Sequence, residues 1–445
     1  MFKSKKIFAI IALVMACVLC FSACGSKENT DPTGNNNGNN VNGGDNSVVQ
    51  GDNISSAGAS GDAYAIWDSS KAALVFVRLD KAPNVNDVIN QSTTVTQYFE
   101  VDEETTEAED VPWESIAMEV CEVVFSESIK PKSTANWFKD FAICSNFDLS
   151  GLDTSHTVNM DNMFKNACAA STDVIELSLV SLNVESVIST QDMFRNFAES
   201  AQTVKLTGLN SWKFNNLVYA NGMFRDFAKS ATVVEFDNMS NFGMSKLEES
   251  EDMFSGACEA VSEFNLPGIE SWNMSSLKSA HSMFNSAGVN ATTWKIGNIG
   301  KWKISKATDM DFMFASAATK ATSFDIGDIG SWNMSKVVTT SSMFANCAPN
   351  ATSWGIGDIG KWKTDTLEYC NDMFNGAAAA AQSFEIGDLG QWNTANVTSM
   401  NNMFNDAGKN AEHVYVGNLS KWNVSNVLHH ENFTNNSKIS TPNFN

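Results

Sequence analysis

Residues that could carry acid–base or metal chemistry are few and widely separated in this chain. There are five histidines among 445 residues, and no HExxH, GxSxG or phosphate-loop motif occurs. Such motifs matter because catalysis needs a nucleophile, a base or a metal ion held close together. His429 and His430 stand beside Glu431 near the end of the chain, where a solvated surface explains them. We therefore predict that the protein is not an enzyme and carries no cofactor and no bound metal.

The cysteines do not favour a zinc site. Three of the nine lie near the N-terminus and the other six are far apart, with no CxxC pair among these six. Cys168 and Cys258 each stand four residues after a Phe, where other repeats have Ala or Gly, so we interpret both as small core residues. A disulfide framework in an exported chain is the alternative.

One acidic residue recurs in three consecutive repeats, at Asp328, Asp358 and Asp388. If neighbouring repeats stack, these carboxylates could meet and bind calcium. A tight turn explains them equally well, because Asn and Asp both favour turns. Asn298 and Asn418 stand at the same repeat position and weaken the metal interpretation.

The first residues predict export and a lipid anchor. A basic start precedes the apolar residues 7–21, which are too few for an ordinary membrane span. Ser22 and Ala23 then precede Cys24, which resembles the bacterial lipoprotein signal, in which the cysteine is lipidated and becomes the new N-terminus. We predict a signal peptide over residues 1–23 and an anchor at Cys24. An ordinary signal peptide cleaved near Ala23 is the alternative.

Residues 24–61 are rich in Asn, Gly, Ser and Asp and predict a lipid-anchored, disordered tether. The tether would hold the folded part off the extracellular face of a bacterial membrane. The formal net charge of −22 argues against a nucleic acid partner, because phosphates would be repelled.

A Met-Phe pair returns every thirty residues and predicts a solenoid, since self-similarity at this period marks units that bury their apolar faces against their neighbours. We expect each Phe to contact its equivalents in the units on either side. The pairs begin at Met163, Met193, Met223, Met253, Met283, Met313, Met343, Met373 and Met403.

Each repeat predicts one helix and one strand. Apolar and small residues around Met343 are spaced by three and four, which favours a helix, with Ser335 as its N-terminal cap. A short alternating stretch such as 324–326 predicts a half-buried strand, and Gly327 predicts a turn after it. The fold class expected is an α/β solenoid of leucine-rich-repeat type, with one short parallel strand and one helix per thirty-residue repeat.

The repeats are expected over residues 131–433, about ten in number, followed by a tail at 434–445. The first repeat is four residues shorter than the others, which we interpret as one missing helical turn. Residues 62–130 predict a small β-rich N-terminal cap, with strands at 63–67, 73–79 and 120–125. Residues 100–110 are acidic and predict an exposed loop.

The repeats resemble the surface repeat of BspA-like bacterial leucine-rich repeat proteins, which is also common in mycoplasma lipoproteins. That repeat combines a Met-Phe pair, a small residue, a short strand and an aromatic residue. Here Trp392 to Met400 before Met403-Phe404 fits it closely, although the period is thirty residues instead of twenty-six. The resemblance implies a cell-surface protein whose relatives adhere to host matrix proteins and to other cells. It does not identify a ligand.

We therefore predict a surface lipoprotein that binds an extracellular protein through a concave face of the strands. A glycan ligand, held by the Trp that recurs in each repeat, is the alternative, although a Trp at one fixed repeat position is more often part of a core. The outward strand positions expected to contact the ligand are Lys205, Glu235, Asn265, Lys295, Asp325, Glu385 and Tyr415.

Overall fold

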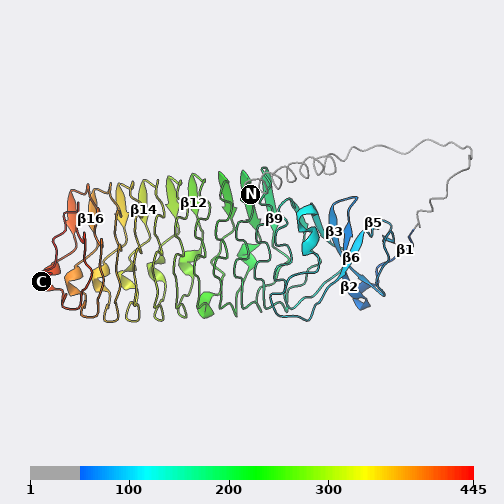
Figure 1. Ribbon diagram of the computed structural model, residues 1–445, viewed down its shortest axis with the longest axis horizontal. Coiled ribbons are helices and arrows are strands. Elements are labelled where there is room, and N and C mark those ends of the chain that lie inside the picture. Colours follow the sequence, from blue (N-terminus) through cyan, green and yellow to red (C-terminus); the bar gives the residue numbers. More distant parts are fainter. Residues whose placement is uncertain (1–50, 445) are drawn as a thin grey trace, which may run out of the picture.

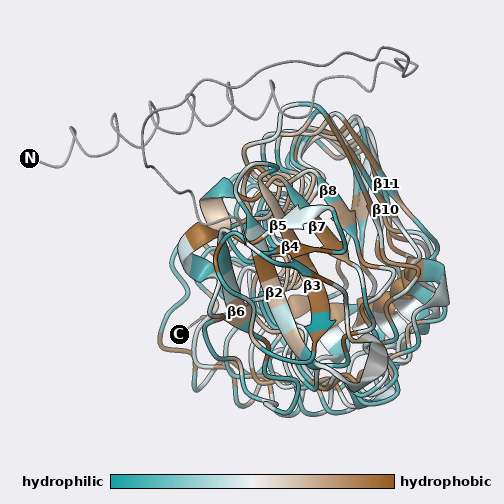
Figure 2. Cartoon of the chain, turned by 90° about the vertical axis from the view of Figure 1, so that its right-hand side faces the viewer, coloured by the Kyte–Doolittle hydropathy of each residue, from teal (hydrophilic) through white to brown (hydrophobic). Residues whose placement is uncertain are grey.

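The computed structural model describes residues 51–444. A β-rich cap occupies one end, and an elongated stack of coils runs from it to the C-terminus (Figure 1). Seen from the cap end, the coils lie one behind another, with β10 and β11 along one side (Figure 2). The predicted signal peptide, Cys24 and most of the predicted tether lie outside the described residues.

The cap is built on a five-stranded sheet in the order β6-β2-β3-β7-β8. β2 pairs antiparallel with β3 and β6, whereas β3, β7 and β8 run parallel, so the sheet leads into the first coil. The three strands predicted in this region are confirmed. The cap strands are β1 (Asn53–Ile54), β2 (Asp62–Asp68), β3 (Ala73–Leu79), β4 (Val88–Ile89), β5 (Thr93–Thr94), β6 (Gln97–Glu100) and β7 (Glu122–Phe125), and β8 (Asn146–Asp148) belongs to the first coil.

Aromatic side chains join the cap to the stack. Phe76 on β3 stacks on Phe125 at 4.4 Å and on Trp137 of the first coil at 5.4 Å between ring centroids. The Trp113 indole N–H, next to the 3₁₀ helix η2 (Glu114–Glu119), donates to the carbonyl of Trp137 at 2.7 Å. These contacts bury the apolar end of the stack, which would otherwise face water.

Each later coil contributes one short strand to one long side of the stack (Figure 1). Strands pair parallel with their equivalents about thirty residues away, but they form separate small sheets and no continuous one. The strands are β9 (Val174–Ser178), β10 (Thr203–Thr207), β11 (Val233–Phe236), β12 (Glu263–Asn265), β13 (Thr293–Lys295), β14 (Ser323–Asp325), β15 (Ser353–Gly355), β16 (Ser383–Glu385) and β17 (His413–Tyr415).

The predicted helix around each Met-Phe pair is absent from the described residues, so the α/β solenoid with one helix per repeat is wrong. Within residues 51–444 every helical segment is a short 3₁₀ helix, and none contains a Met-Phe pair. Besides η2, the cap contains η1 (Gly58–Ser60). The coils contain η3 (Leu209–Ser211), η4 (Met244–Lys246), η5 (Ile269–Ser271), η6 (Ile299–Lys301), η7 (Ile329–Ser331), η8 (Ile359–Lys361), η9 (Leu389–Gln391) and η10 (Leu419–Lys421).

Left-handed residues explain why no helix forms there. Around Phe164, Asn162 has a φ of 57°, Asn166 of 59° and Cys168 of 56°. A right-handed helix cannot contain such residues, so the segment is a run of tight turns. Most coils place Asn, Asp, Gly or Ser two residues before and two after the Phe, and these residues tolerate a left-handed backbone better than most. The shorter first coil therefore does not lack a helical turn.

The hydrogen bonds of this segment alternate between the coil and its neighbour. The Phe314 amide donates to the carbonyl of Met343, one coil ahead, at 2.8 Å, and Ser316 donates to Ala345 at 2.8 Å. The amides in alternation with these donate within the coil, Ala315 to the carbonyl of Phe312 at 2.9 Å and Ala317 to that of Phe314 at 3.1 Å. Half of the amides thus stabilise the contact between coils, a pattern that an α-helix cannot offer.

The interior contains columns of stacked rings. Phe314 stacks on Phe284 at 5.4 Å and on Phe344 at 5.3 Å, which confirms the predicted contact between equivalent Phe residues. In the last coil Phe433 occupies the place of the Met. Its carbonyl accepts the hydrogen bond from the Phe404 amide at 2.8 Å, as the Met carbonyl does in other coils. Phe444 packs on Phe433 at 5.3 Å, so the final described residues cover the end of the stack.

Candidate ligand-binding face

The seven residues predicted to contact a ligand all lie on strands, and their side chains are solvent-accessible. Lys205 is half-buried and the other six are exposed. The strand ladder sets Lys205 opposite Glu235, Asn265 opposite Lys295, and Glu385 opposite Tyr415. Alternation explains the outcome, because the neighbours of each residue along its strand point into the core. We call this column the strand face.

Both lysines of the strand face are paired with carboxylates of neighbouring strands. Lys205 lies 3.4 Å from a carboxylate oxygen of Glu176 and 3.9 Å from one of Glu235. Lys295 makes a 2.9 Å ion pair with Glu263, on the strand beside it. Exposed pairs of this kind contribute little to stability, so they leave the lysines free to exchange partners with a ligand.

Two adjoining grooves open on the strand face where the sheet is interrupted. β11 does not pair with β12, and a groove of about 490 Å³ lies between them, lined by Glu235, Glu263, Asn265 and Pro267 among others. A second groove of about 590 Å³ continues from Asn265 and Pro267 to Lys295 and neighbouring residues. Four of the seven predicted residues, Asp325 included, therefore line one connected depression. The interruption itself could not be predicted from repeat spacing.

Five overlapping stretches of the chain match the model of the family described as "Mycoplasma protein of unknown function, DUF285". The matches cover residues 132–261, 175–295, 224–354, 258–385 and 319–443, and together they span 132–443, more than half of the chain. The chain belongs to this family. Its coils are therefore repeats of a mycoplasma-type repeat protein, and the cap lies outside the matched residues. No curated protein matches the chain. The resemblance to BspA-like leucine-rich repeats stays a prediction.

The recurring Trp of the DUF285 repeats belongs to the core. Trp302 is 3 % exposed and stacks on Trp272 and Trp332 at 6.2 and 6.4 Å. Its indole N–H donates to the carbonyl of Ile269 in the preceding coil at 2.8 Å. These rings are covered on both faces, so they cannot offer a stacking platform to a sugar.

The recurring acidic residue of the DUF285 repeats caps a 3₁₀ helix. One carboxylate oxygen of Asp328 accepts from the Gly330 amide at 3.0 Å and from the Asp358 amide at 3.1 Å. Lys361 lies 3.7 Å from Asp328 and 3.5 Å from Asp358. Asp388 caps in the same way, and its hydrogen bond from Gln391 is the main reason why its pKa is lowered. The turn interpretation accounts for all three, and calcium is not needed.

The cysteines of the DUF285 repeats have the environment of core residues. Cys168 and Cys258 are buried, as predicted, and burial raises the pKa of both thiols. Cys347 and Cys370 are also buried with raised pKa values, so all four are poor nucleophiles and poor metal ligands. Within residues 51–444, no helix is both long enough and apolar enough to span a membrane.

Proposed function

We propose that this protein is a lipid-anchored binding protein of the bacterial cell surface, which holds an extracellular protein ligand on its strand face. The anchor rests on the Cys24 motif in the sequence. The single observation that supports binding is the connected depression between β11 and β14, where Glu235, Asn265, Lys295 and Asp325 converge. Charges of both signs line it, which suits recognition of a protein surface better than of a uniformly charged polymer.

The stack suits this role because its binding surface is rigid. Every coil is held to the next by backbone bonds and stacked rings, so the outward side chains keep a fixed spacing. A ligand that matches the spacing does not have to order the protein when it binds, which is the general advantage of a preorganised site. We infer that the cap and the C-terminal tail protect the ends and that the central strands carry the specificity.

The test is binding of the full chain to panels of matrix proteins and of polysaccharides. For a protein that binds, Lys295→Glu should weaken affinity by about tenfold or more, because a favourable contact becomes a repulsive one. Lys336→Glu is the matched control, since Lys336 is also exposed but lies outside both grooves. Equal loss in both variants would show only a charge effect. Binding to neither panel would leave a spacer role, and binding to polysaccharides alone would favour a glycan ligand held by groups other than the buried Trp.

A further inference from the structure

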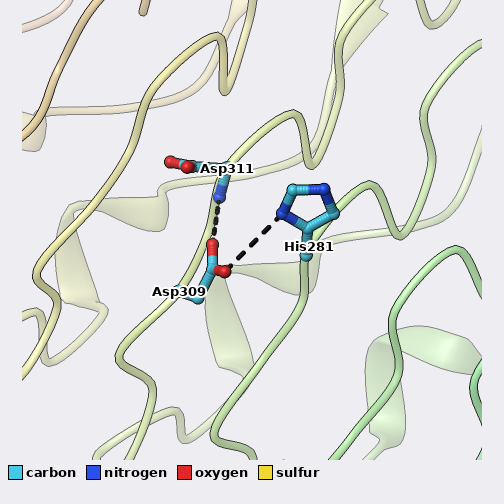
Figure 3. A group of neighbouring side chains, drawn as sticks. All are labelled: His281, Asp309 and Asp311. Carbon is cyan, nitrogen blue, oxygen red and sulfur yellow. Dashed lines mark hydrogen bonds and ion pairs between the residues drawn. The ribbon is translucent and has the colours of Figure 1, made fainter.

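A histidine and two aspartates of neighbouring coils meet away from the strand face. His281 belongs to one coil, and Asp309 and Asp311 belong to the next (Figure 3). One ligand atom from each side chain lies within 4.8 Å of the others, and this is the one such group of three His, Cys, Asp or Glu within the described part of the chain. The imidazole Nδ1 faces a carboxylate oxygen of Asp309 at 3.6 Å.

Hydrogen bonds orient one oxygen of each carboxylate. Oδ1 of Asp309 accepts from the amide of Asp311 at 2.8 Å, which leaves Oδ2 facing His281. Oδ1 of Asp311 accepts from the Ser341 amide at 2.5 Å and from the Thr339 hydroxyl. In both residues one oxygen is oriented by the protein, and within residues 51–444 the other accepts no hydrogen bond. Bonds of this kind to a ligating carboxylate are a regular feature of metal sites.

The surroundings are acidic and partly covered. Two coils before Asp309 and Asp311, and one coil before His281, the equivalent positions hold Glu249 and Glu251. The nearby Lys278 is paired with Glu248 at 2.5 Å, and no described Lys or Arg forms an ion pair with Asp309 or Asp311. The Phe312 ring covers the imidazole at 5.6 Å between centroids. The uncompensated negative charge would attract a cation.

Phe312 is unusual for its position. It has a φ of 56°, where nearly all other coils have Asn, Asp, Gly or Ser, and it is 39 % exposed. A bulky side chain with such a backbone is uncommon. Its ring lies tilted against the imidazole of His281, and this apolar neighbour would strengthen electrostatic interactions at the imidazole.

We propose that His281, Asp309 and Asp311 bind a divalent transition-metal ion that bridges two coils. One imidazole with two carboxylates suits Zn²⁺ and similar ions, whereas Ca²⁺ prefers six to eight oxygen ligands. Zn²⁺ bonds to N and O are about 2.0–2.2 Å long, so ligand atoms of a tetrahedral site lie roughly 3.3 Å apart. The 3.6 Å between His281 and Asp309 is close to this value, and the Asp311 carboxylate must turn inward. Water would complete the coordination.

The test is titration of the EDTA-treated full chain with Zn²⁺ by calorimetry, and with Co²⁺ by visible absorption, which reports coordination by nitrogen and oxygen. The wild-type protein should bind one equivalent of each ion at this site. Asp311→Asn should lower Zn²⁺ affinity by more than about tenfold, and His281→Gln should do the same. His413→Gln is the control, because it removes a surface histidine outside the group of three.

Asp311→Asn is the sharper variant because Asn suits this position. Asn371, two coils further on, accepts from the Ser399 hydroxyl at 2.5 Å and from the Asn401 amide at 3.0 Å, as Asp311 does from Thr339 and Ser341. The variant should therefore melt, without metal, at the wild-type temperature or above. No saturable Zn²⁺ binding by wild type, or the same affinity in Asp311→Asn, would overturn the site. Tighter binding of Ca²⁺ than of Zn²⁺ would overturn the transition-metal assignment.

Discussion

The cap and the stack are both held by backbone hydrogen bonds between strands, but the paired strands lie at different separations along the chain. In the cap, β2 and β3 are seven residues long and pair with each other across a four-residue connection. In the stack, a strand such as β14 is three residues long, and its partner lies one whole coil away. The central hairpin of the cap is thus specified by neighbours in sequence, and β6 and β7 join it from farther along the chain, with Tyr64 opposite Glu100 and Ala73 opposite Glu122. The stack has no such hairpin core and repeats one separation of about thirty residues.

The side chains follow the same division. β2 alternates between two apolar clusters, with Ala65 and Trp67 on one side and Tyr64 and Ile66 on the other. In the stack, an aromatic ring of one coil packs on the equivalent ring of the next, as Phe314 does on Phe284 and Phe344. Stability in such an array is approximately the sum of units and of contacts between neighbours, so damage should remain local.

Phe314→Ala tests that division with the largest expected effect. Removal of a fully buried ring between two stacked partners should lower the free energy of unfolding by about 3–5 kcal/mol. Hydrogen exchange should show faster opening around residues 284–344, while β2 and β3 keep their protection. Phe312→Ala is the control in the same coil, because that ring is 39 % exposed. A melting temperature equal to that of wild type in Phe314→Ala would contradict the stacked interior.

The correct predictions rest on patterns whose meaning does not depend on distant partners. Alternation predicted the strands of the cap and the outward direction of Lys295 and Asp325, because side chains alternate across any strand. The turn at Gly327 followed from the residue type, and its φ is 83°. The aromatic columns followed from the period alone.

The helix was wrong because consecutive tight turns also place apolar residues three and four apart. The distinguishing signal was present in the sequence. Asn136 and Asp140, on either side of Phe138, begin two columns of residues that favour a positive φ, two positions before and two after the Phe of a coil. A helix would not select such residues at regular positions in its interior.

Two features of the candidate sites needed the structure. The depression between β11 and β14 depends on where strand pairing stops, and the regular thirty-residue spacing does not mark those points. The group of His281, Asp309 and Asp311 forms no local motif, because its members belong to different coils. An alignment of the repeats places His281 and Asp311 at the same position of successive coils, because 281 and 311 differ by one period.

Ser316→Gly tests the backbone of the stack directly. Ser316 has a φ of 55°, and Gly stands at the equivalent positions 256 and 376. A left-handed backbone costs an L-residue about 1–2 kcal/mol, and replacement by Gly removes this cost. Part of the stabilisation is lost because Gly gives the unfolded chain greater conformational freedom. We expect stability to rise by about 0.5 kcal/mol. The measurement is denaturant unfolding.

Ala315→Gly is the matched control, one residue earlier. Ala315 is not among the residues with positive φ, so this change should lower stability by about 0.5–1 kcal/mol. Opposite signs for adjacent positions would sharpen the contrast between the stack and regular secondary structure. Losses of similar size in both variants would instead support the helix that the spacing predicted.

Asp161→Asn tests a hydrogen bond between two coils, and its expected effect on the melting temperature is small. One oxygen of Asp161 accepts from the Ser189 hydroxyl at 2.5 Å and from the Gln191 amide at 2.7 Å, and Asn keeps such an oxygen. Burial raises the pKa of Asp161, so the folded state disfavours its ionised form. Protonated Asp161 stabilises the folded state fully at pH values below 3.8, its ordinary pKa. This contribution to stability is lost as pH rises through the raised pKa of the folded state. Asp161→Asn should therefore melt higher than wild type at neutral pH, by no more than about 2 °C.

Asp153→Asn should show the opposite dependence, because Asp153 pairs across the boundary between stack and cap. The hydrogen bonds from Ser155 are the main cause that lowers the pKa of Asp153, and Lys130 lies 3.2 Å from its carboxylate. Its charged form stabilises the fold above the ordinary pKa, and that contribution disappears as pH falls through the lowered one. The Asp153→Asn variant should melt lower than wild type at neutral pH and equal it in acid. A shift of both melting temperatures in the same direction at neutral pH would contradict this contrast. It would show that ionisation does not affect stability in opposite ways at Asp161, between two coils, and at Asp153, beside the cap.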